Sequence, residues 1–149
     1  MKIIILHGLY MHGMVMQPLS QKLKNLGYET QVITYNSVAI NPHRLFSSID
    51  HALSDHGRNI LVGHSLGGLI IKQYLDSRKH SEECISHVVT LGSPMRGASI
   101  VTRIQDLGMG TILGNSPHFG CKSIVAAGIT HKSLAVSQAL FLSARERSF

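Results

Sequence analysis

The segment Gly63-His64-Ser65-Leu66-Gly67 constrains this chain more than any other feature. An apolar run over 59–62 precedes it and an apolar stretch over 68–75 follows it, which predicts a strand, a tight turn and a helix. A strained turn between strand and helix tolerates only small flanking residues, and it exposes its serine as a nucleophile. The helix N-terminus also favours negative charge that develops there. We therefore interpret Ser65 as a nucleophile and not as part of a chance Gly-x-Ser-x-Gly match.

The elements expected on either side of this segment alternate along the chain. We expect strands at 2–6, 29–35, 59–62 and 87–91, with helices at 14–26, 42–56 and 66–77 between them. Such alternation predicts an α/β fold, a mostly parallel sheet with helices on both faces and sites at the carboxyl ends of its strands. Beyond Pro94 the pattern is weaker, with a candidate helix at 99–113, a fifth strand at 122–128 and a helix or frayed tail at 132–149.

Composition indicates a single soluble globular domain over residues 1–149 and excludes several other classes. The hydrophobic fraction is 44% and the charged fraction 15%, which is ordinary for a folded protein. The formal charge is +6, but lysines and arginines are scattered and only 5% of residues are aromatic, so no nucleic-acid surface is expected. The positive charge is still compatible with weak contact with an anionic membrane surface.

The cysteine content and the lengths of the apolar runs indicate in which cellular compartment the protein is expected. The two cysteines, Cys84 and Cys121, are too few for a disulfide framework and predict unpaired thiols in a reducing, cytoplasmic environment. No apolar run approaches the ~18 residues of a transmembrane helix. The apolar run that follows Met1 is also too short for a signal peptide.

Three segments together resemble the α/β-hydrolase superfamily, in its bacterial lipase-like and GPI-inositol-deacylase-like branch. They are Ile5-Leu6-His7-Gly8 after the first strand, Gly63-His64-Ser65-Leu66-Gly67-Gly68 at the turn, and Leu91-Gly92-Ser93-Pro94-Met95-Arg96-Gly97 after the fourth strand. The resemblance covers about residues 2–100. The sequence over about 121–149 diverges from the family pattern.

The resemblance implies a serine hydrolase that acts on small-molecule carboxylic esters or lipids through an acyl-enzyme. Ser65 would be the nucleophile, and the backbone N–H groups of Leu9 and Leu66 would form the oxyanion hole. We interpret His7 and His64 as structural residues of the two turns. No cofactor or metal is expected, because the histidines show no ligand spacing.

The acid and the histidine of a catalytic triad are less clear. In the family both follow the nucleophile, on loops at the carboxyl ends of strands. Asp106 and His131 are the candidates, His131 because it follows the expected fifth strand by three residues. No aspartate follows Asp106, and truncation or a shifted reading frame near the C-terminus would explain this loss. The alternative hypothesis is an inactive remnant of the fold that serves as a binding or structural module.

A phosphate-binding loop over residues 63–72 is a third interpretation of the glycine-rich segment. A phosphate-binding loop requires Gly-Lys-Ser or Gly-Lys-Thr at its end, and no such triplet follows Gly63 before Lys72. The sequence therefore excludes this reading and leaves the hydrolase and the inactive remnant.

Overall fold

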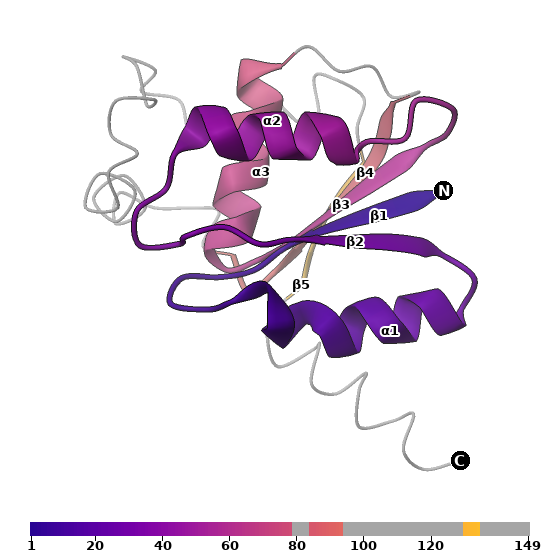
Figure 1. Ribbon diagram of the computed structural model, residues 1–149. Coiled ribbons are helices and arrows are strands. Elements are labelled where there is room, and N and C mark those ends of the chain that lie inside the picture. Colours follow the sequence, from indigo (N-terminus) through magenta and orange to yellow (C-terminus); the bar gives the residue numbers. More distant parts are fainter. Residues whose placement is uncertain (79–83, 94–129, 135–149) are drawn as a thin grey trace.

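Five parallel strands form one sheet in the computed structural model, which describes residues 1–78, 84–93 and 130–134. The sheet has the spatial order β2-β1-β3-β4-β5, and every neighbouring pair is parallel (Figure 1). The strands are β1 (Lys2–Leu6), β2 (Glu29–Ile33), β3 (Asn59–His64), β4 (Ile85–Leu91) and β5 (Thr130–Leu134). The predicted α/β fold with a parallel sheet is confirmed.

Helices cover both faces of this sheet, as the alternation predicts. In Figure 1, α1 (Gln17–Asn25) lies on one side of the strands, and α2 (Pro42–Ala52) and α3 (Leu66–Ser77) lie on the other. A short 3₁₀ turn, Gly13–Met16, leads into α1. None of these helices is long and apolar enough to cross a membrane.

The strand β1, which lies between β2 and β3, shows how the two layers of helices are held to the sheet. Ile3 and Ile5 pack with Met16 and Val62 on the α1 side. Their neighbours Ile4 and Leu6 belong to the larger cluster with α2 and α3. Successive side chains of a strand point to opposite faces, so an unbroken apolar run supplies both cores.

Most expected boundaries are close to those observed, and the clearest difference is at Lys132–Leu134. The expected helix at 14–26 is divided between the 3₁₀ turn and α1, and Gly27 ends it with φ of +88°. The predicted strand at 122–128 and helix at 99–113 lie outside the described residues. The observed β5 occupies Thr130–Leu134, so the expectation of a helix or a frayed tail from Lys132 is wrong for residues 132–134. The sequence Thr-His-Lys-Ser-Leu has no apolar run and gave no signal of a buried strand.

The start of β3 is fixed by one buried side chain. Asn59 is fully buried, and its amide oxygen accepts a hydrogen bond from the Ser54 N–H at 2.8 Å. Its amide nitrogen donates to the carbonyl oxygens of Ser54, Gly57 and Cys84 at 2.9–3.2 Å. These bonds join the loop before β3 to the residue that precedes β4.

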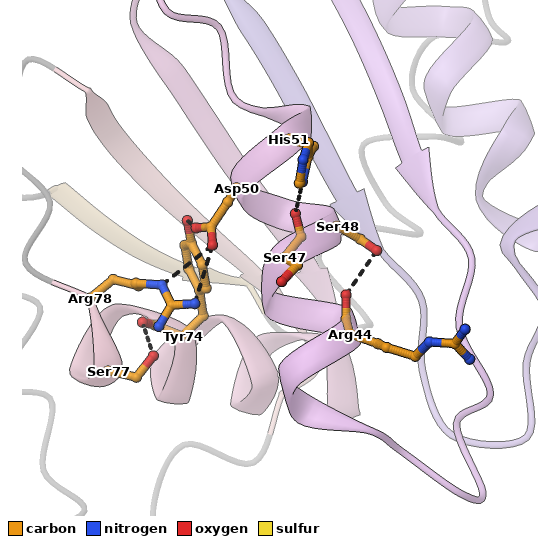
Figure 2. A network of polar contacts seen from close by, with 8 residues as sticks. All are labelled: Arg44, Ser47, Ser48, Asp50, His51, Tyr74, Ser77 and Arg78. Atoms are coloured by element: carbon orange, nitrogen blue, oxygen red, sulfur yellow. Dashed lines mark hydrogen bonds and ion pairs between the residues drawn. The ribbon is translucent and has the colours of Figure 1, made fainter.

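A polar network joins α2 to α3 (Figure 2). The Tyr74 hydroxyl donates to Asp50 Oδ1 at 2.6 Å, and Arg78 Nη2 donates to Asp50 Oδ2 at 3.2 Å. Arg78 also lies over the Phe46 ring, with its guanidinium carbon 6.0 Å from the ring centroid. Burial, followed by the hydrogen bond to Asp50, raises the pKa of Tyr74, so this phenol stays protonated and donates. The network therefore holds the C-terminal end of α3 to α2, and the candidate nucleophile Ser65 directly precedes the other end of this helix.

Candidate active site

Ser65 occupies the sharp turn between β3 and α3. Its backbone has φ of +49° and ψ of −113°, and its side chain is half-buried. In the described part of the chain, Ser65 and Tyr10 are the non-glycine residues with positive φ. Such a conformation costs about 1–3 kcal/mol and persists only where surrounding structure enforces it. The turn that the glycine pattern predicted is therefore present, with Ser65 at its apex.

The two glycines that flank this turn have no room for a side chain. A Cβ on Gly63 would lie 2.6 Å from the Gly67 carbonyl carbon. A Cβ on Gly67 would lie 2.6 Å from the Leu6 carbonyl oxygen and 2.8 Å from that of His7. Both clashes involve backbone atoms, which cannot rotate away. The close packing of α3 on the ends of β1 and β3 is therefore what requires glycine.

Backbone contacts define the direction of the turn. The Ser65 N–H donates to the Leu91 carbonyl oxygen at 2.9 Å, which ties the turn to the end of β4. Leu66 is the first residue of α3, so its N–H is among those that have no carbonyl partner within the helix. An amide at this position can donate to an anion beside Ser65.

The turn after β1 lies directly against Ser65. A Cβ on Gly8 would be 3.2 Å from Ser65 Cβ and 2.9 Å from His64 Nδ1. The structure therefore brings the segment His7–Leu9 beside the serine, although almost sixty residues separate them in the sequence. Leu9 follows Gly8 and is half-buried at this edge.

His7 is held by hydrogen bonds at both ring nitrogens. The Tyr35 N–H donates to His7 Nε2 at 3.3 Å, and because a backbone N–H can only donate, we assign the ring proton to Nδ1. His7 Nδ1 then donates to the Gly8 carbonyl oxygen at 2.9 Å. In a planar trans peptide the N–H points away from the C=O, so this bond also sets the direction of the Leu9 N–H. His7 is thus a structural residue of the turn, as interpreted from the sequence.

Tyr35 completes the surroundings of His7 and was not identified from the sequence. Its ring stacks on that of His7, and its hydroxyl donates to the His7 carbonyl oxygen at 2.5 Å. Burial raises the pKa of Tyr35, which keeps the phenol protonated as a donor. The available signal was its place just after β2, at the same sheet edge as His7.

His64 lies at the end of β3, with its ring against Gly8. It is half-buried, and its Nδ1 has no hydrogen-bond partner. Burial lowers the pKa of His64 below its usual value of 6.5. The neutral imidazole is therefore the stable form in this packed position.

The structure describes one of the two candidate triad partners, His131, and not the other, Asp106. Asp106 lies outside the described residues. His131 is the second residue of β5 and pairs in register with Val88, so its predicted position on a loop after the strand is wrong. Val88 pairs in turn with Leu61, which lies four residues before Ser65. The His131 backbone is therefore about 13 Å from the level of Ser65, measured along the strands. Within the described residues, no hydrogen bond joins the Ser65 hydroxyl to a histidine.

Comparison with known proteins gives one family and a set of similar folds. The model of the family described as "PGAP1-like alpha/beta domain" matches residues 30–119, more than half of the chain. A search among curated proteins finds no match. Among solved structures, 29 chains match.

Three of these structures illustrate the likeness. An extracellular α/β-hydrolase from a Paenibacillus species has a TM-score of 0.58 at 14% identity, covering 93% of this chain and 78% of that one. A pyrethroid hydrolase from Sphingobium faniae has a TM-score of 0.54 at 20% identity, covering 64% and 41%. A monoacylglycerol lipase from Paleococcus ferrophilus has a TM-score of 0.53 at 21% identity, covering 72% and 46%. The matched regions span less than half of the latter two proteins. At these identities the likeness is one of fold, and the fold is that of the α/β-hydrolases.

Proposed function

Because the chain belongs to the family of PGAP1-like alpha/beta domains, we propose that it is a serine hydrolase that cleaves carboxylic esters or lipids. The observation that carries the proposal is the conformation of Ser65, strained at φ of +49° and packed beside Gly8. A strained turn of this kind presents a serine hydroxyl to substrate. The pyrethroid hydrolase and the monoacylglycerol lipase of similar fold are themselves named for hydrolytic activities.

The proposed reaction proceeds through an acyl-enzyme. Ser65 Oγ attacks the ester carbonyl carbon while a base takes its proton, and the N–H groups of Leu9 and Leu66 hold the oxyanion. The tetrahedral intermediate then collapses, the C–O bond to the alcohol breaks, and the leaving oxygen takes up the proton. Water attacks the acyl-enzyme and releases the acid. Loss of one oxyanion donor in such a site costs about 3–4 kcal/mol of transition-state stabilisation.

The base and acid of this reaction remain predictions. His131 and Asp106 are the candidates from the sequence, and the register of β5 counts against His131 as a direct partner of Ser65. The same observation favours the second candidate function, an inactive remnant of the fold that binds ligands. Without a base, a serine retains little of the advantage of a triad. A cytoplasmic location, expected from the unpaired cysteines, also stays a prediction.

One experiment separates the two functions. The purified chain is treated with a fluorophosphonate probe and assayed on p-nitrophenyl butyrate, beside Ser65→Ala and the matched control Ser48→Ala on the exposed side of α2. An active hydrolase gives labelling and turnover that Ser65→Ala abolishes and Ser48→Ala preserves. Absence of both signals in the wild-type chain, or signals that survive in Ser65→Ala, would refute the proposed function.

A further inference from the structure

A groove of about 600 Å³ lies at the carboxyl edge of the sheet, beside the turn after β1. Two short segments form its walls, one just after Leu9 and the other just after β2. Its lining residues are Tyr10, Met11, His12, Thr34, Tyr35, Asn36, Ser37 and Val38. Its volume is within the range of about 300–1,000 Å³ that is typical of small-molecule sites.

The groove begins next to the candidate nucleophile. A Cβ on Gly8 would lie 3.0 Å from Met11 Sδ and 3.2 Å from Ser65 Cβ. Met11 and Ser65 therefore both lie against Gly8 and are near neighbours. A molecule whose carbonyl group lies at Ser65 would therefore meet the groove at Met11, one of its lining residues.

The ionisable side chains in the lining of the groove are those of His12, Tyr10 and Tyr35. The lining contains no aspartate, glutamate, lysine or arginine, although the whole chain has a formal charge of +6. Two of its apolar members are open to solvent, with Tyr10 81% exposed and Val38 55% exposed, and Met11 and Tyr35 are half-buried. Asn36 Oδ1 is already occupied, because it accepts hydrogen bonds from the N–H groups of Val38 and Ala39 at 3.0 and 3.2 Å. Such a surface suits a neutral hydrocarbon chain better than a phosphate or carboxylate group.

The backbone of Tyr10 has an unusual conformation for a residue with a large side chain. Its φ is +55°, a region that favours glycine, and yet the position carries an exposed aromatic ring. Strained residues of this kind gather at ligand-binding and catalytic sites. Tyr10 and Ser65 share this feature at the same edge of the sheet.

We propose that the groove of Tyr10, Met11, Tyr35 and Val38 binds the hydrocarbon chain of an ester, and that Tyr10 determines the preferred chain length. That this hydrocarbon chain belongs to an ester rests on the proposed function. Binding of an apolar chain in the groove does not depend on it.

The test uses Tyr10→Gly in the full chain, because glycine adopts φ of +55° without strain and the variant is expected to fold. Tyr10→Phe keeps the ring. Tyr28→Ala, which removes a 39% exposed tyrosine at the opposite edge of the sheet, is the matched control. Binding is measured in the Ser65→Ala background with the neutral fluorophore N-phenyl-1-naphthylamine. We expect about tenfold weaker binding for Tyr10→Gly, and no change for Tyr10→Phe or Tyr28→Ala. Equal binding by Tyr10→Gly and the control would overturn the proposal.

Hydrolysis by variants that keep Ser65 then shows whether the groove holds the acyl chain or the alcohol chain of the ester. The ratio of kcat/KM for p-nitrophenyl decanoate over butyrate reports on the acyl chain, and the ratio for decyl over methyl acetate reports on the alcohol. We expect Tyr10→Gly to lower one of these two ratios about tenfold, because KM for the long-chain ester rises. If esters are hydrolysed and neither ratio changes in Tyr10→Gly, the role of Tyr10 is refuted. If the fluorophore binds in a Tyr10-dependent way but no ester is cleaved, the groove is supported and the hydrolase proposal fails.

Discussion

The rings of His7 and Tyr35 stack with their centroids 4.1 Å apart and their planes 14° from parallel. This pair joins the residues that follow β1 and β2 at the edge of the sheet where Ser65 lies. Two hydrogen bonds reinforce the stack, from the Tyr35 N–H to His7 Nε2 and from the Tyr35 hydroxyl to the His7 carbonyl oxygen. The orientation of the Gly8–Leu9 peptide depends on this pair, because His7 Nδ1 holds the Gly8 carbonyl oxygen.

His7→Ala is predicted to impair the oxyanion turn more than it impairs substrate binding. Without the bond to Gly8, the Leu9 N–H loses its fixed direction, so kcat should fall about 10- to 100-fold while KM changes little. Hydrolysis of p-nitrophenyl butyrate provides the measurement, with the exposed His43→Ala as control. Tyr35→Phe keeps the stacked ring and the backbone N–H donor, so its kcat should fall less than that of His7→Ala. A fall in kcat that is equal for His7→Ala and His43→Ala would contradict this role.

Gly67→Ala is predicted to destabilise the chain despite the better helix propensity of alanine. The added Cβ would lie 2.6 Å from a carbonyl oxygen of β1, and overpacking against backbone costs about 1–3 kcal/mol. Gly57→Ala is the matched control, since the nearest atom to its Cβ would be 3.7 Å away. Urea unfolding should give a lower midpoint for Gly67→Ala alone. Similar midpoints for the two variants would show that α3 has room to move away from β1.

Tyr74→Phe is predicted to weaken the contact between α2 and α3. The variant removes a donor to the Asp50 carboxylate, and hydrogen bonds to charged groups contribute about 1.5–3 kcal/mol. The free energy of unfolding in urea should fall by an amount in this range. Tyr28→Phe, at a more exposed position, should change it by less than about 0.5 kcal/mol. A loss no larger than that of Tyr28→Phe would mean that Asp50 is satisfied equally well by Arg78 and water.

The packing of His64 predicts lower stability in mild acid. Because burial lowers its pKa in the folded state, the unfolded chain binds more protons at pH values below about 6.5, the usual pKa of histidine. The contribution of His64 is therefore fully present above pH 6.5 and is lost as the pH falls toward the lower folded-state pKa. The decrease in urea midpoint between pH 7.5 and 5.5 should be smaller in His64→Asn than in the wild-type chain. In His56→Asn, at an exposed loop position, the decrease should match the wild type.

Much of the fold could be predicted because β1 is apolar on both faces and turn and cap residues mark the ends of other elements. The run Lys2–Leu6 could only be a buried strand, and Asn41-Pro42 marked a helix start that the structure shows with Asn41 capping the Arg44 N–H. The strand β5 could not be predicted in the same way. Its residues Thr130–Leu134 carry no apolar pattern, and the pairing with β4 alone identifies it as a strand.

The candidate site was predictable where backbone shape determines it and less so where side chains meet across the fold. Glycine spacing indicated the turn at Ser65, because no other residue fits at Gly63 or Gly67. The roles of Tyr35 and Tyr10 depend on contacts between segments far apart in sequence or on an unusual φ, and neither leaves a local pattern.

The position of β5 at the end of the sheet has a consequence for the order in which the chain folds. The described buried core runs from Ile3 to Val88, within four strands joined by short crossovers. About 40 residues of chain separate β4 from β5, so β5 is the last strand to be synthesised and its pairing adds a further cost in loop-closure entropy. During synthesis the first four strands can therefore assemble before Thr130–Leu134 leaves the ribosome, and β5 adds to a preformed edge. Amide hydrogens of β1 and β3 should accordingly exchange last, and those of β5 first among the strands.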